Sequence, residues 1–212
     1  MKYDIFPRYN DALSIIHKVL AQPDFVSLSE IIAPYKPFGL RTYERGAENR
    51  QSSNDLILHS SKGESYISRS EVKSSMDYID SFNVITGKAL SGHLGETDEN
   101  GQVKVLATTK IIGKGEVCTE SYIAIGKFQN QIEAEALLKF ISSRFARFLL
   151  LQALPTLDIR KERFVFVPNQ NFTAESDIDW SVSTTDIDKQ LYQKYGLSES
   201  EISFIESTIK PM

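Results

Sequence analysis

The strongest constraint on the fold is a long amphipathic pattern that begins at Asn130. Glu133 follows three residues later, which gives a variant of the capping box that opens helices. Apolar residues then recur with a period of about 3.6 until Pro155, which cannot continue a helix. These apolar residues are Ala134, Leu137, Leu138, Ile141, Phe145, Phe148 and Leu149. We therefore expect one long core helix near residues 131–153.

The region before this helix is typical of a β-sheet. Runs rich in β-branched and aromatic residues are bounded there by glycines and polar residues. The runs are residues 55–60, 64–68, 82–86, 103–108 and 118–126. The first two are joined around Ser61-Lys62-Gly63, a short connection that suits a hairpin. Together the runs predict a mixed or antiparallel central sheet.

Helical patterns also lie at both ends of the chain. Residues 11–21 are amphipathic, with Asn10 as an N-cap and Pro23 just beyond the end, and Ser27 or Ser29 is placed to cap a brief turn. Residues 163–167 indicate a further strand. Two helices are expected near the carboxyl end. Ser183 or Thr184 opens the first and Gly196 ends it; Ser198 with Glu201 caps the second, before Pro211.

This order of elements belongs to the α+β class. The central sheet would pack with one long core helix and with C-terminal helices. We expect a helical connector over residues 1–35, a sheet-rich domain with the core helix over 36–170, and a helical segment over 171–212.

The composition excludes several classes of protein. No apolar run approaches the roughly 18 residues of a membrane span, and residues 1–10 lack the apolar core of a signal peptide, so we expect a cytoplasmic location and no membrane partner. A single cysteine, Cys118, excludes an internal disulfide framework and a Cys-rich zinc site. The net charge of −4 opposes non-specific coating of nucleic acid. Sequence-specific DNA binding remains compatible with this net charge, because the Lys and Arg side chains of such a protein can share one face.

Catalytic signatures are absent from the sequence. There is no P-loop, no nucleophile elbow, no glycine-rich turn for S-adenosylmethionine and no Pro-Pro dipeptide. Asp24, Asp55, Glu71 and Lys73 offer the carboxylates and lysine of a metal-dependent nuclease. The same residues also fit a helix-ending turn and a solvated connection.

His93 lies in a glycine-rich polar stretch, residues 87–101, together with Glu96, Asp98 and Glu99. This mixture contains ligands for a metal, but it is also typical of a solvated hairpin loop. Such a loop is compatible with insertion into a groove of DNA. His17 and His59 fall within a predicted helix and strand, as surface or satisfied core histidines do.

The basic residues indicate nucleic-acid binding more strongly than the carboxylates indicate a nuclease. Several lie among Tyr35, Phe38 and Tyr43, which mixes phosphate-pairing with stacking groups. Others flank the strands around the His93 stretch or follow the core helix. As candidate DNA-binding residues we select Lys36, Arg41, Lys88, His93, Lys104, Lys114, Arg160 and Lys161.

Eight short segments resemble one family in their shared order. They are KPFGL at 36–40, SGHLGE at 91–96, SYIAIG at 121–126, SRFARFL at 143–149, FVP at 166–168, DIDW at 177–180, LYQKYGL at 191–197 and FIESTIKPM at 204–212. They are similar to the carboxyl-terminal region of adenine-specific DNA methyltransferases of type II restriction-modification systems, including those fused to or paired with an endonuclease. Asp177, Asp179 and Trp180 are interpreted as a connector, with Trp180 anchoring apolar area.

This resemblance implies that residues 36–170 form a target-recognition domain for double-stranded DNA. The family's catalytic and cofactor-binding half is missing, so no catalysis and no cofactor are expected here. The parent would be a site-specific adenine N6-methyltransferase that uses S-adenosylmethionine. Its catalytic domain would act in cis or in trans, with or without an endonuclease domain. The alternatives are a fragment of a metal-dependent restriction nuclease and a domain that docks subunits of the complex.

Overall fold

The structure, a computed structural model, describes residues 7–88, 97–106, 108–155 and 158–212 and places the described strands in two sheets of three strands each. In the first sheet, β1 (Leu56–Ser60) is antiparallel to β2 (Gly63–Ile67) and parallel to β5 (Glu116–Cys118). In the second, β3 (Phe82–Gly87) is antiparallel to both of its neighbours, β4 (Thr109–Ile112) and β6 (Tyr122–Phe128). The single central sheet expected from the sequence is therefore divided into one mixed and one antiparallel sheet.

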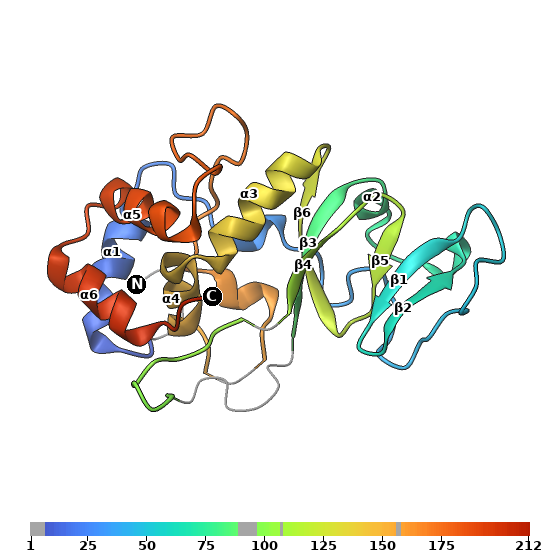
Figure 1. Cartoon of the computed structure of the whole chain (residues 1–212), viewed down its shortest axis with the longest axis horizontal. Coiled ribbons are helices and arrows are strands. Elements are labelled where there is room, and N and C mark those ends of the chain that lie inside the picture. Colours follow the sequence, from blue (N-terminus) through green and yellow to red (C-terminus); the bar gives the residue numbers. More distant parts are fainter. Residues whose placement is uncertain (1–6, 89–96, 107, 156–157) are drawn as a thin grey trace.

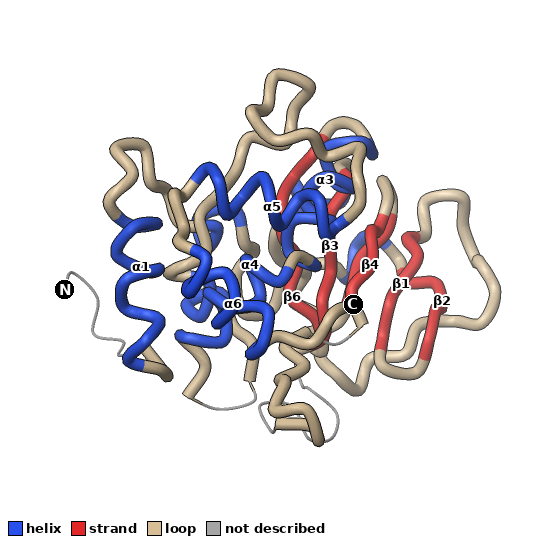
Figure 2. The backbone as a smooth tube through the Cα atoms, turned by 60° about the vertical axis from the view of Figure 1, so that its left-hand side comes forward, coloured by secondary structure: helices blue, strands red, loops and turns tan. Residues whose placement is uncertain are grey.

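The longer helices gather at one end of the molecule and the mixed sheet lies toward the opposite end, with the antiparallel sheet between them (Figure 1). These helices are α1 (Leu13–Leu20), α3 (Gln131–Ser142), α4 (Arg144–Gln152), α5 (Thr184–Lys194) and α6 (Glu199–Thr208), while the single turn α2 (Met76–Ile79) precedes β3. Short 3-10 helices span Asn10–Ala12, Leu28–Ile31, Arg69–Glu71 and Lys161–Phe164. The view in Figure 2 shows the same separation of helices from the mixed sheet.

The antiparallel sheet separates two apolar cores. Side chains alternate between the faces of a strand. In β3, Val84 therefore packs into the larger core beneath the helices, whereas Ile85 packs into the smaller core against the mixed sheet. Ile125 and Ala124 of β6 divide in the same way. Burial on both faces makes this sheet the connection between the two ends of the molecule.

The predicted long helix is interrupted at Ser143, so the expectation of one continuous helix over 131–153 is wrong. Ser143 has extended backbone angles, φ −63° and ψ 151°, and its hydroxyl accepts a hydrogen bond from Ala146 N at 3.1 Å. Asp188 of α5 accepts two more, from Arg144 N at 3.0 Å and Phe145 N at 2.9 Å. These acceptors satisfy N–H groups that a helix start leaves free. The apolar period continues across the break because both helices face the larger core.

Two predicted strands are also wrong. Within residues 103–108, Val103 exchanges main-chain hydrogen bonds with Thr208 and Lys210 instead of joining a sheet. Residues 163–167 overlap the 3-10 helix Lys161–Phe164, and Phe164, Phe166 and Val167 are all buried in the larger core. Burial alone explains the apolar character of this run.

The predicted N-cap Asn10 is wrong, because Asn10 is the first residue of a 3-10 helix whose N-cap is Tyr9, without a side-chain cap. Several other local predictions are confirmed. The hairpin of β1 and β2 turns at Ser61 and Lys62. Asn130 caps α3, Ser183 caps α5, and Ser198 with Glu201 forms the complete capping box of α6. The α+β class is confirmed as well, while the three segment boundaries stay predictions. Within the described ranges, no helix has the length and apolar character that crossing a membrane requires.

Candidate nucleic-acid interface

Four segments distant in sequence meet where β3 ends. Lys88, the residue after β3, donates its main-chain N–H to Ser121 O at 2.9 Å and accepts from Ile159 N at 3.1 Å. Glu120 N donates to Leu40 O at 2.9 Å. Main-chain hydrogen bonds thus fix the positions of the residues that follow β3, precede β6 and follow α4, together with Leu40, five residues after Tyr35.

Tyr35 is the centre of this junction, and its side chain and backbone are 53% exposed. Lys88 Nζ lies 3.7 Å from the centroid of the Tyr35 ring, and it also donates to the Tyr35 carbonyl oxygen. Arg160 Cζ lies 5.6 Å from the same centroid. Both distances are within the range of cation–π attraction.

Carboxylates pair with two arginine side chains of this region, Arg160 and Arg41. Asp158 pairs with Arg160, and Glu120 pairs with Arg41 at 3.8 Å. Burial lowers the pKa of Lys88, which is only 6% exposed, while the charges of Glu120 and Asp158 oppose that effect. We call Tyr35, Arg41, Lys88, Glu120, Asp158 and Arg160 the Tyr35 cluster. Its three cations exceed its two carboxylates by one positive charge.

The Tyr35 cluster brings together three of the eight candidate residues, Arg41, Lys88 and Arg160. Lys36 follows Tyr35 and Lys161 follows Arg160 in the sequence, and both are half-buried. The Lys36 carbonyl accepts from Gly39 N and Ser74 Oγ, both at 3.1 Å. His93 and the SGHLGE segment lie outside the described residues.

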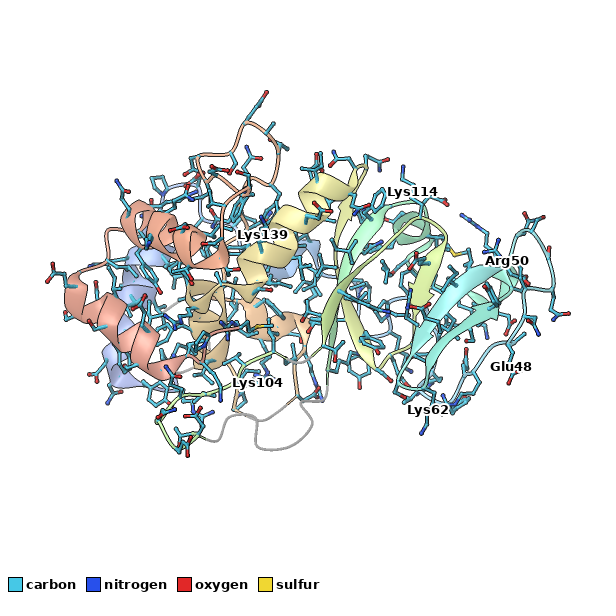
Figure 3. All side chains as sticks on the ribbon, in the orientation of Figure 1. Glu48, Arg50, Lys62, Lys104, Lys114 and Lys139 are labelled. Atoms are coloured by element: carbon cyan, nitrogen blue, oxygen red, sulfur yellow. The ribbon has the colours of Figure 1, made fainter. Side chains whose placement is uncertain are left out.

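Lys104 and Lys114 are exposed and lie on opposite edges of the molecule (Figure 3). Lys114 Nζ is 5.7 Å from the ring centroid of Phe82, the first residue of β3, whereas Lys88 follows the last. A strand of this length spans roughly 20 Å. Lys114 is therefore separated from the Tyr35 cluster by the length of β3.

The candidate nuclease residues are divided between the two ends of the molecule. Asp24 follows α1 in the helical end, whereas Asp55 and Glu71 precede β1 and follow β2. Asp55 Oδ2 accepts from Gln51 N and Ser52 N, each at 2.8 Å, which is the role of a loop carboxylate. In the part of the chain that is described, no group of three His, Cys, Asp or Glu residues is placed to hold a metal ion.

A second polar network joins the two sheets around His59, which is buried in β1. His59 Nε2 lies 2.6 Å from Glu116 Oε2, and Lys110 Nζ lies 2.8 Å from His59 Nδ1 and 3.2 Å from Glu64 Oε1. Since the ammonium group can only donate, Nδ1 accepts from Lys110 and Nε2 donates to Glu116. His59 is therefore a satisfied core histidine.

Sequence reasoning missed Glu120 and Asp158, the counter-charges of the candidate cations. It noted Tyr35 only as one aromatic residue among several. A pair of prolines, Pro34 and Pro37, frames Tyr35 and is the only local signal of its fixed position. The carboxylates have no such signal, because their contacts depend on how segments far apart in the chain meet.

Neither a protein-family model, nor a curated protein, nor a solved structure matches this chain.

Proposed function

We propose that this chain binds double-stranded DNA and provides the target recognition of an adenine-specific restriction-modification methyltransferase. The catalytic domain, with its S-adenosylmethionine, would lie on another segment or subunit, and an endonuclease domain would be a further partner. Such a system acts on cellular DNA, so the expected location is the cytoplasm. The order of the eight resembling segments supports the family, and the Tyr35 cluster is the observation that supports DNA binding.

The two arginines of the Tyr35 cluster are accessible to phosphate, whereas Lys88 is buried. The side chains of Arg41 and Arg160 are each 50% exposed. Exposed ion pairs contribute only about 0–1 kcal/mol, so their carboxylates are readily exchanged for the phosphates of a duplex. Guanidinium groups suit this exchange because they form paired hydrogen bonds with phosphate oxygens.

Their placement also suits recognition. The cluster is fixed by main-chain hydrogen bonds at the end of a sheet buried on both faces, and rigid scaffolds of this kind present binding residues with little loss of entropy. Phosphate contacts from such a scaffold set the register of the protein on the duplex. In the sequence, Lys88 leads directly into the stretch that contains His93, which we propose contacts the base edges.

The test is the affinity of the purified chain for a set of duplexes of varied sequence, measured by fluorescence anisotropy. We expect Arg41→Glu and Arg160→Glu each to weaken binding by about tenfold, since each reverses a charge at a phosphate. Lys189→Glu, on an exposed lysine of α5, is the matched control and should change affinity by less than about twofold.

Two results would contradict the proposal. Absence of binding of the unaltered chain to every duplex would favour docking of subunits over DNA binding. Cleavage of plasmid by the purified chain with Mg²⁺, lost on Glu71→Ala, would favour the nuclease.

A further inference from the structure

One ring nitrogen of the buried His59 has both an ammonium group and a carboxylate beside it. Lys110 Nζ lies 2.8 Å from His59 Nδ1, and Glu64 Oε1 lies 3.3 Å from the same atom. The other ring nitrogen, Nε2, lies 2.6 Å from Glu116 Oε2. Because the ammonium group of Lys110 can only donate, Nδ1 carries no proton in this arrangement and the ring is neutral.

A second arrangement of the same side chains suits the protonated ring. A proton added to Nδ1 from solvent would point at the Lys110 ammonium group, and two positive groups 2.8 Å apart repel each other. The new N–H group needs an acceptor, and the nearby Glu64 carboxylate is one. The side chains of Lys110 and Glu64 are 39% and 62% exposed, so Lys110 can turn into solvent while Glu64 approaches the ring.

Two other titratable side chains that the neighbouring strands bring near His59 are uncharged. Cys118 of β5 is opposite His59 in the strand register, and burial raises the pKa of its thiol to about 12. Tyr122 of β6 donates its hydroxyl to Ser60 O at 3.3 Å, and burial raises its pKa as well. The charge balance at the ring therefore depends on Glu64, Glu116 and Lys110.

The contacts of Lys110 cross the joint between the two sheets. Lys110 belongs to β4 of the antiparallel sheet, whereas His59, Glu64 and Glu116 belong to β1, β2 and β5 of the mixed sheet. The hydrogen bond from Lys110 to His59 is thus a polar link from one sheet to the other. In the second arrangement His59 bonds only to carboxylates of its own sheet, and this link is lost.

We propose that His59, Lys110 and Glu64 form a pH-sensitive switch at the joint between the sheets. Near neutral pH, His59 Nδ1 accepts from Lys110 and joins the sheets; in mild acid, the protonated Nδ1 donates to Glu64 and Lys110 is released. Histidine is the side chain whose charge ordinarily changes between pH 5 and 8, so the change is expected in that range. The switch does not depend on the proposed DNA binding.

The first test is the thermal unfolding of Lys110→Met, which keeps an apolar stem and removes the donor. At pH 7.5 we expect Tm to fall by roughly 2–4 °C, because one hydrogen bond of about 1 kcal/mol is lost. At pH 5 the substitution should not lower Tm, since Lys110 has already left the ring. Lys62→Met, at the exposed turn between β1 and β2, is the matched control and should have the same small effect at both pH values. An equal loss for Lys110→Met at the two pH values would overturn the switch.

The second test follows the imidazole of His59 in the full chain by NMR, with its signals identified by their absence from His59→Gln. Lys110→Met should raise the midpoint of the titration by about 1 pH unit, because it removes a positive charge beside the ring. Glu64→Gln, at an exposed position, should lower the midpoint, because it removes the acceptor of the protonated state. A midpoint unchanged in Glu64→Gln, or a ring that does not titrate between pH 4 and pH 8, would contradict the proposal.

Discussion

The carboxylate of Asp188, in α5, accepts a hydrogen bond at 2.9 Å from the main-chain N–H of Phe145, in the first turn of α4. Its second oxygen accepts from Arg144 N at 3.0 Å. Asp188 is buried, which raises its pKa, and the hydrogen bonds and the charge of Arg147 oppose that effect. One side chain of α5 thus completes the start of another helix.

Asp188→Ala should lower the free energy of unfolding by about 2–3 kcal/mol, because it leaves two N–H groups of α4 without acceptors in a buried place. Urea unfolding followed by the fluorescence of Trp180 measures this, since Trp180 is the chain's one tryptophan and packs against Phe140 and Phe172. Asp177→Ala removes only an exposed pair with Lys194 and should cost less than about 1 kcal/mol. Equal losses would show that the cap contributes nothing.

Glu116 links stability to pH. The hydrogen bond from His59 holds the pKa of Glu116 below its ordinary value. A depressed carboxyl pKa adds stability that is present above the unfolded pKa, about 4.3, and is lost as the pH falls through the folded pKa. Glu116→Gln should therefore cost about 1–2 kcal/mol at pH 7 and progressively less below about pH 4.

The comparison for Glu116 is Glu175→Gln, at an exposed position after the larger core's Phe172. It should change stability by less than about 0.5 kcal/mol at either pH. Chemical unfolding at pH 7 and pH 3.5 supplies all four values. A Glu116→Gln deficit that is the same at both pH values would contradict a pH-dependent contribution from the Glu116 carboxylate.

Alanine substitutions at Gly46 and Gly196 distinguish the effect of steric crowding from that of backbone strain. Both have positive φ, 63° and 59°, which any other residue adopts at a cost of roughly 1 kcal/mol. A Cβ on Gly46 would lie 2.4 Å from the carbonyl oxygen of Tyr66, whereas one on Gly196 would meet nothing within 4 Å. Gly46→Ala should therefore lower Tm by clearly more than Gly196→Ala. Equal shifts in calorimetry would mean that the loop at Gly46 moves freely away from β2.

Local signals in the sequence predicted helix ends well and helix continuity poorly. Asn130, Ser183 and Ser198 cap their helices as expected, because an N-cap bonds within its own first turn. The break at Ser143 could not be predicted from periodicity, since the apolar residues on both sides face one core. Part of the capping there comes from Asp188, more than forty residues later in the chain.

The candidate site was predictable only in part for the same reason. Composition identified Arg41, Lys88 and Arg160 as basic residues near aromatic ones, and the structure places Lys88 and Arg160 at Tyr35 and Arg41 beside Glu120. The separation of Lys114 from this group follows from strand direction. Lys88 and Lys114 flank opposite ends of β3 because β4 returns antiparallel beside it.

That separation gives a last prediction, on the salt dependence of DNA binding. Each phosphate neutralised by a cation contributes about −0.9 to the slope of log affinity against log salt. Arg160→Ala should make the slope shallower by about one, because Arg160 lies in the Tyr35 cluster. Lys114→Ala should leave it unchanged, since Lys114 lies beside Phe82 at the far end of β3. Salt titrations of the two variants and the unaltered chain on one duplex measure the three slopes. A shallower slope for Lys114→Ala alone would place the DNA at the opposite end of the sheet.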